Sequence, residues 1–77
     1  MVRAYVLIQT YVGQAGAVAE RLARVGGVRS AEHVSGPYDV IGLIESTDLD
    51  TLGHETLRWV QAVEGITRTV TCPVLNT

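Results

Sequence analysis

The loop at residues 35–39 (Ser-Gly-Pro-Tyr-Asp) holds the residues of this sequence with the clearest capacity for ligand chemistry. Gly36 and Pro37 favour a tight turn, and a glycine lets backbone N–H groups approach a bound carboxylate closely. The carboxylate of Asp39 can accept a hydrogen bond from an ammonium group. These groups suit the two charged ends of an α-amino acid. The alternative is structural, because an Asp beside a turn often accepts hydrogen bonds only from the backbone of its own loop.

Other residue types that carry catalysis or bind metals are few and scattered. His33 and His54 have no further ligand at metal-binding spacing, so both are expected to be solvated. Cys72 has no neighbouring base in the sequence, which favours a small buried hydrophobe over a nucleophile. Residues 13–16 open a helix but contain no basic residue, which favours a flexible helix entry over an anion-binding loop. We therefore expect no catalytic residue, no metal site and no cofactor.

Six segments must position these groups. Segments rich in β-branched residues predict strands over residues 3–12, 28–34, 39–45 and 66–74. A helical apolar period predicts one helix over residues 13–25 and a second that begins at a cap on Thr47 or Asp48. The apolar positions of the second helix share one face and are Leu49, Leu52, Thr56, Val60 and Val63. Trp59 falls beside that face, so it either flanks the core or lies exposed at a contact between subunits.

The order of these segments is strand, helix, strand, strand, helix, strand. Val25-Gly26-Gly27-Val28 is repeated as Val63-Glu64-Gly65-Ile66, each at the end of a helix. Two such halves predict an α+β, ferredoxin-like βαββαβ sandwich, with both helices on one face of a four-stranded antiparallel sheet. The strands at residues 3–12 and 39–45 are apolar on both faces, which predicts that they are central. The uncovered face of the sheet then needs a partner, and a second copy of the chain is the simplest one.

Length and composition agree with a single associating domain. The 77 residues form one domain (1–77), and 47% of them are hydrophobic, which excludes a disordered chain. A chain of this length buries only about 60% of its surface on folding, so association is favoured. Six scattered Arg, no Lys and a net charge of -2 argue against direct contact with nucleic acid. No apolar run is long enough to span a membrane, and the single cysteine points to the cytoplasm.

Three segments of the chain resemble one family. The hairpin at residues 34–40 (VSGPYDV), the end of the chain at residues 63–74 (VEGITRTVTCPV) and its beginning at residues 4–10 (AYVLIQT) are similar to the effector-binding domain of the Lrp/AsnC regulators. That domain is called RAM, for regulation of amino acid metabolism. The resemblance covers nearly the whole chain. The combination of G-x-Y-D in the hairpin with G-[VI]-x-x-T in the last strand is fairly specific, whereas either motif alone is weak.

The resemblance implies a sandwich that dimerises through its sheets, as a dimeric α+β barrel, with dimers joined into octamer-like rings. Small effectors, usually amino acids, bind between dimers near the hairpin. By motif, the implied ligand contacts are Gly36, Tyr38, Asp39, Thr67, Thr69 and Thr71. Because the chain begins at the first strand, it resembles a stand-alone form without the helix-turn-helix. A role in transcription would then require co-assembly with a full-length relative.

Two other functions remain open from the sequence. Small ferredoxin-like chains also form dimeric barrel enzymes of the monooxygenase or isomerase type, with the reaction in a pocket between sheet and helices. Such an enzyme needs His33, His54 or Tyr5 inside a cavity of the single chain. The remaining possibility is an assembly partner whose ligand site is vestigial.

Overall fold

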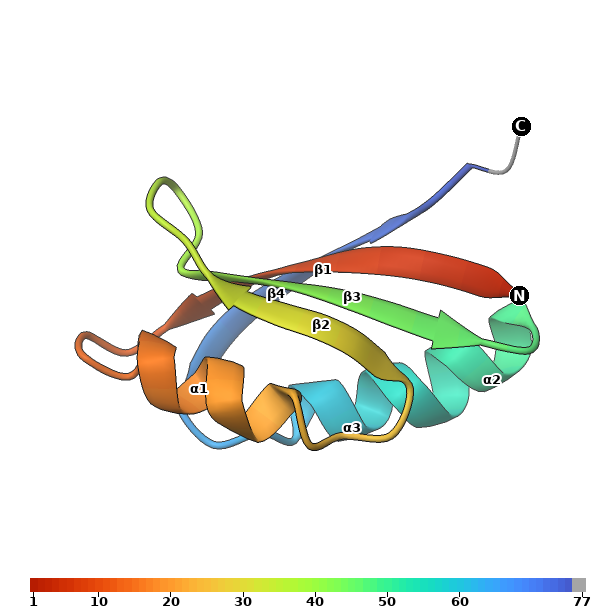
Figure 1. The fold of residues 1–77 in the computed structure, drawn as a ribbon, viewed down its shortest axis with the longest axis horizontal. Helices are drawn as coiled ribbons and strands as arrows, with labels where there is room; N and C mark the ends of the chain where they lie inside the picture. Colours follow the sequence, from red (N-terminus) through yellow and green to blue (C-terminus); the bar gives the residue numbers. More distant parts are fainter. Residues whose placement is uncertain (76–77) are drawn as a thin grey trace.

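Buried and more exposed residues alternate along two strands of one twisted sheet, and the helices lie against a single face of that sheet (Figure 1). The computed structural model describes residues 1–75. In chain order its elements are β1 (Val2–Thr10), α1 (Ala15–Leu22), β2 (Val28–His33), β3 (Val40–Ser46), α2 (Leu49–Thr51), the π-helical turn η1 (Leu52–Thr56), α3 (Leu57–Gln61) and β4 (Ile66–Pro73). The predicted βαββαβ order is confirmed, since α2, η1 and α3 follow one another without a break.

The four strands lie in the order β2-β3-β1-β4, and every neighbouring pair is antiparallel. The two strands that are apolar on both faces, β1 and β3, are central, as predicted. Pro73 ends the edge strand β4, where a missing N–H disrupts the sheet least. Within residues 1–75 the helices are too short or too polar to traverse a lipid bilayer.

The core lies between the sheet and the helix layer. It takes every second residue of β1 and β3, together with the inner faces of the helices. Its buried hydrophobic residues are Ala4, Val6, Ile8, Val18, Leu22, Val40, Ile44, Leu52 and Val60. The predicted second helix is therefore anchored by Leu52 and Val60, with the buried Thr56 between them.

The prediction that Leu49 belongs to this buried face is wrong, because its side chain is 62% exposed. Asp48 caps the helix immediately before it, so Leu49 lies in the first turn, at the margin of the sheet (Figure 1). The residues that do face the core, Leu52, Thr56 and Val60, are spaced four apart rather than at the average of 3.6. The wider π-helical turn η1 lies within this stretch.

The first helix is shorter than the predicted 13–25, and the repeated glycines lie in the turns that lead from α1 to β2 and from α3 to β4. Gly27 has a φ of +90° and Gly65 a φ of +104°, a region that favours glycine. A Cβ on Gly27 would lie 2.8 Å from Cγ2 of Thr56, and a Cβ on Gly65 would lie 2.8 Å from Cγ2 of Val18. Each glycine therefore lets its own helix end pack closely against the other helix. The weak repeat in the sequence corresponds to a real equivalence between the two halves.

The sheet face opposite the helices, called here the open face, carries an apolar centre. On this face Tyr5, Leu7, Ile41, Leu43, Val70 and Cys72 lie side by side across β1, β3 and β4. Tyr5 is 45% exposed and Cys72 is exposed as well, so the expectation that Cys72 is buried does not hold in the single chain. All the helices within residues 1–75 lie against the other face of the sheet (Figure 1).

Candidate functional site

The loop between β2 and β3 (residues 34–39) projects beyond the sheet on the side away from the helices (Figure 1). Gly36 has a φ of +139°, a conformation that side chains rarely adopt, and it is exposed. Tyr38 is half-buried. The side-chain Nε2 of Gln9 on β1 donates to the carbonyl oxygen of Pro37 at 3.1 Å. This bond ties the loop to the central strand.

Asp39 joins the loop to the end of β1 through its backbone and its side chain. Its N–H donates to the carbonyl oxygen of Ile8 at 2.8 Å. Its carboxylate Oδ2 accepts from the backbone N–H of Thr10 at 2.9 Å and lies 3.5 Å from the Thr10 hydroxyl. The structural alternative predicted that Asp39 accepts hydrogen bonds from its own loop. The donor is instead Thr10, at the end of the neighbouring strand β1. Thr10 is 29 residues away, so nothing in the local sequence indicated it.

The second carboxylate oxygen, Oδ1, has no hydrogen-bond partner within residues 1–75. Asp39 borders a surface hollow of about 420 Å³, which also touches His33 and the segment from the end of β1 to the start of α1. Gln14, the N-cap of α1, makes no side-chain hydrogen bond to that helix, and its first turn has no acidic residue. The hollow therefore has a carboxylate on one side and the positive end of a helix dipole on the other.

The three threonines of β4 do not join Asp39 in one cluster within the chain. Thr67 is exposed at an irregularity in the pairing of β1 with β4, and β1 separates it from Asp39 by roughly 10 Å. Thr69 and Thr71 lie on the helix-facing side of β4, where Nε2 of Gln61 donates to the Thr69 hydroxyl at 3.3 Å. A ligand that contacts all of the predicted residues must therefore either extend across the edge of the sheet or bind between two copies, each of which supplies some of the residues.

Residues 3–77 match the family model described as the Lrp/AsnC ligand binding domain. The chain belongs to this family. The fold, with its four-stranded sheet and one helix layer, is that of the effector domain that the sequence resembled. The chain is therefore a ligand-binding domain of the kind found in Lrp/AsnC regulators.

Solved structures and a curated relative are similar to this Lrp/AsnC domain. TTHA0845 from Thermus thermophilus is 28% identical with a TM-score of 0.88, and the match covers 100% of this chain and 96% of that one. A feast or famine regulatory protein from M. tuberculosis, solved in complex with L-methionine, is 23% identical with a TM-score of 0.76. This chain is covered completely there, but it spans only 52% of the regulator. A homocitrate synthase from Sulfurisphaera tokodaii is 34% identical over 60 residues, which are 78% of this chain and 13% of the synthase.

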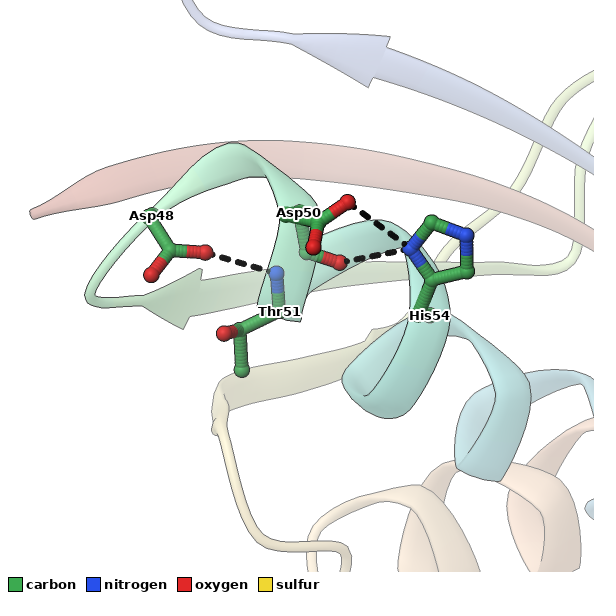
Figure 2. Close-up of polar contacts among 4 residues, drawn as sticks. All are labelled: Asp48, Asp50, Thr51 and His54. Carbon is green, nitrogen blue, oxygen red and sulfur yellow. Dashed lines mark hydrogen bonds and ion pairs between the residues drawn. The ribbon is translucent and has the colours of Figure 1, made fainter.

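The side chains that an enzyme of this architecture would need are exposed in this Lrp/AsnC domain. His33 lies at the rim of the hollow, Tyr5 on the open face, and His54 on the helix layer with 81% of its side chain exposed. Nδ1 of His54 lies 3.1 Å from both the carboxylate Oδ1 and the backbone oxygen of Asp50 (Figure 2). These three positions lie on separate surfaces and do not converge on one cavity.

Asp48 caps the second helical segment of the Lrp/AsnC domain. Its Oδ1 accepts from the backbone N–H of Thr51 at 2.7 Å (Figure 2). This hydrogen bond stabilises the carboxylate and lowers the pKa of Asp48 below its usual value near 3.8. Within residues 1–75, no group of three or more His, Cys, Asp or Glu side chains is arranged to hold a metal ion. The polar cluster at this helix start is accounted for by capping.

Proposed function

We propose that this Lrp/AsnC domain senses a free amino acid at the β2–β3 loop and assembles through its open face. The observation that carries the proposal is the state of the Asp39 carboxylate. One oxygen is fixed by Thr10, the other has no hydrogen-bond partner in the part of the chain that the structure describes, and Asp39 lies at the rim of a hollow. The family match supports a small ligand, and the related M. tuberculosis regulator was solved with L-methionine.

The chemistry of an α-amino acid suits this arrangement. Oδ1 of Asp39 accepts a charge-assisted hydrogen bond from the ligand's ammonium group. The ligand's carboxylate is received by backbone N–H groups, either those near Gly36 or those at the start of α1. Tyr38, half-buried in the same loop, is the predicted contact for the ligand's side chain. An anchored Asp39 keeps its geometry before the ligand arrives, which lowers the entropic cost of binding.

Assembly completes the site in this proposal. The β2–β3 loop projects on the side of the open face (Figure 1), so a second copy packed on that face lies beside the loop. Thr67, Thr69 and Thr71 stay predicted contacts for a ligand bound between dimers, because Thr69 and Thr71 lie on the helix-facing side of β4, which the open-face partner does not cover. Octamer-like rings, and any link to DNA through co-assembly with a full-length regulator, belong to the same proposal.

Thermal unfolding with a panel of the twenty amino acids tests the ligand. At 100 times its dissociation constant, a ligand raises the free energy of unfolding by about 2.7 kcal/mol, so at least one amino acid is expected to raise Tm clearly. Asp39→Asn keeps an oxygen to accept from Thr10 but removes the charge. This variant should unfold near the wild-type Tm without ligand and lose the ligand-induced rise. Asp39→Ala should lose both the rise and some basal stability.

Asp50→Asn is the matched control, because it removes an exposed carboxylate on the helix layer. It should leave the ligand-induced rise unchanged. If none of the twenty amino acids raises Tm, the ligand proposal fails, and an assembly partner with a vestigial ligand site is the function that is left. A rise that survives in Asp39→Asn would place the ligand elsewhere.

A further inference from the structure

The turn that joins β1 to α1 (residues 11–14) carries two exposed hydrophobic side chains. Tyr11 is 64% exposed, and Val12 beside it is completely exposed. Tight turns usually hold Gly, Pro, Asn, Asp or Ser, because these residues suit the turn backbone or form hydrogen bonds with it. Two large hydrophobic residues at such a position are therefore not explained by the turn itself.

Backbone contacts hold this turn in place. The N–H of Gln14 donates to the carbonyl oxygen of Tyr11 at 3.0 Å, and Gly13 between them has a φ of +81°. The N–H of Tyr11 donates to the carbonyl oxygen of Gly65 at 3.1 Å, which fixes the turn to the residue before β4. The two hydrophobic side chains are thus presented to solvent by a defined backbone.

The same two side chains line the hollow of about 420 Å³ that Asp39 borders. The turn and the β2–β3 loop lie at the same end of the sheet (Figure 1). Among the described residues that line this hollow, Asp39 is the only acid, none is an arginine, and the one histidine, His33, is exposed. A ligand whose ammonium group is bound by Asp39 would therefore meet no second carboxylate and no guanidinium there, but it would meet two hydrophobic side chains.

We propose that Tyr11 and Val12 select the ligand of this site, and that the ligand is an α-amino acid with an uncharged, apolar side chain. The inference rests on the proposed function, because Asp39 must bind the ammonium group. The side chain of the ligand then lies in the hollow against Tyr11 and Val12. The contact removes apolar surface of both partners from water, which favours binding.

Charged and polar ligand side chains suit this hollow less well. A lysine or glutamate side chain would lose water without gaining a carboxylate or a guanidinium as its counter-ion. A glutamine side chain can form a hydrogen bond with His33, but water competes for that bond because His33 is exposed, so the net gain is small. The apolar contact has no such competitor.

The predicted contact of Tyr38 with the ligand is a separate one, because Tyr38 is not among the residues that line this hollow. Tyr38 belongs to the β2–β3 loop, whereas Tyr11 and Val12 belong to the turn before α1. Variants at the two places therefore show which of them the ligand's side chain contacts.

Isothermal titration calorimetry with the unbranched series L-alanine, L-norvaline and L-norleucine tests this inference. For wild type, the dissociation constant should fall by about two- to four-fold for each added methylene group. L-Lysine and L-glutamate should each bind at least about ten-fold more weakly than L-norleucine, since desolvating a charge without a partner is costly. The heat capacity change of binding should become more negative as the side chain lengthens.

Val12→Thr keeps the shape of the side chain but replaces a methyl group with a hydroxyl group. It should weaken L-norleucine binding by about three-fold or more and leave L-alanine binding unchanged. Tyr11→Ser should do the same, whereas Tyr11→Phe should bind as wild type does, because the inference uses the ring and not the hydroxyl group. Leu49→Thr is the matched control, since it removes an exposed hydrophobic side chain on α2, at the other end of the sheet (Figure 1), and should leave the whole series unchanged.

The inference and the proposed function fail in different ways. A wild-type series without dependence on side-chain length, or tighter binding of L-lysine or L-glutamate than of L-norleucine, would overturn the inference. So would an unchanged series in both Val12→Thr and Tyr11→Ser, or a flattened series in Tyr38→Ala in their place. In each of these cases the proposed function stands if Asp39→Asn abolishes binding. If no amino acid binds to wild type, the proposed function itself is wrong.

A second copy of the chain is the other group that can cover Tyr11 and Val12. Analytical ultracentrifugation without ligand separates this occupant from an amino acid. Wild type and Tyr11→Ser should have the same molar mass, because the inference assigns the turn to the ligand. A lower mass for Tyr11→Ser would assign the turn to a contact between copies and would overturn the inference.

Discussion

The two oxygens of the Asp39 carboxylate have different surroundings. Oδ2 accepts from Thr10 and fixes the end of β1 to the base of the loop, while Oδ1 has no hydrogen-bond partner among the described residues 1–75, and Asp39 borders the hollow. A buried or half-buried carboxylate that already has one strong hydrogen bond can bind a cation without reorganising first. Asp39 can therefore anchor the loop and contact a ligand at the same time. Asp39→Asn tests the ligand contact alone, whereas Asp39→Ala removes both the anchor and the contact.

A second carboxylate, Asp48, makes a stability contribution that depends on pH. Its pKa in the folded chain is lowered by the hydrogen bond from Thr51, so folding favours the charged form. The stabilisation is fully present above the usual value near 3.8 and is lost as the pH falls through the lower, folded value. Asp48→Ala should therefore lower Tm by a few degrees near neutral pH, and by much less in strong acid.

The comparison with Asp48→Asn shows whether charge or capping matters. An Asn also caps a helix, so this variant should keep most of the wild-type Tm near neutral pH and lose the acid-dependent part. Thermal melts followed by circular dichroism across the acidic range measure both effects. A difference between wild type and Asp48→Ala that stays constant with pH would contradict the assignment.

At the scale of elements, periodicity and turn residues were sufficient to predict each strand, the two central strands and the Asp48 cap of the second helix, whereas the first helix begins at Ala15 and not at residue 13. They failed where the geometry depends on distant contacts. Leu49 matched the helical period but lies beyond the core, and the four-residue spacing of Leu52, Thr56 and Val60 is compatible with an ordinary α-helix as well as with the π-helical turn η1. The site was predicted only in part for the same reason. The loop was evident, whereas the bond from Thr10 to Asp39 depends on the pairing of β1 with β3.

Gly27 and Gly65, in the turns after the two helices, give a test of the packing between the two halves of the chain. Gly65→Ala puts a methyl group 2.8 Å from Cγ2 of Val18 and strains a φ of +104°. We expect the free energy of unfolding to fall by roughly 1–3 kcal/mol. Gly16→Ala is the matched control, because no atom lies within 4 Å of its Cβ position in α1. It should be neutral or stabilise by up to about 1 kcal/mol.

Urea unfolding without ligand measures both glycine variants. The m-value should remain unchanged, since the variants and the wild type expose the same additional surface on unfolding. Equal stabilities for Gly65→Ala and Gly16→Ala would mean that the helix ends tolerate a side chain, and that the close approach of Gly65 to Val18 is not a constraint.

At the scale of the whole molecule, the hydrophobic content exceeds what one core can bury. Hydrophobic residues are 47% of the 77 residues. They form the core between the sheet and the helices and also the apolar centre of the open face on the other side of the sheet. Leu43 lies near the middle of that face, opposite Tyr5 on β1 and Ser30 on β2. Because the helices already cover the other face, association is the remaining way to remove this apolar surface from water.

Leu43→Glu tests the open-face dimer directly. In a face-to-face pair, two buried carboxylates without partners would oppose each other across the interface, which should raise the dimer dissociation constant by at least about 100-fold. The monomer should still fold, since this side chain points away from the helix core. Leu43→Met keeps an apolar side chain of similar volume and should preserve the dimer. Analytical ultracentrifugation measures the molar mass, and a Leu43→Glu variant that keeps the wild-type mass would exclude the open face as the site of pairing.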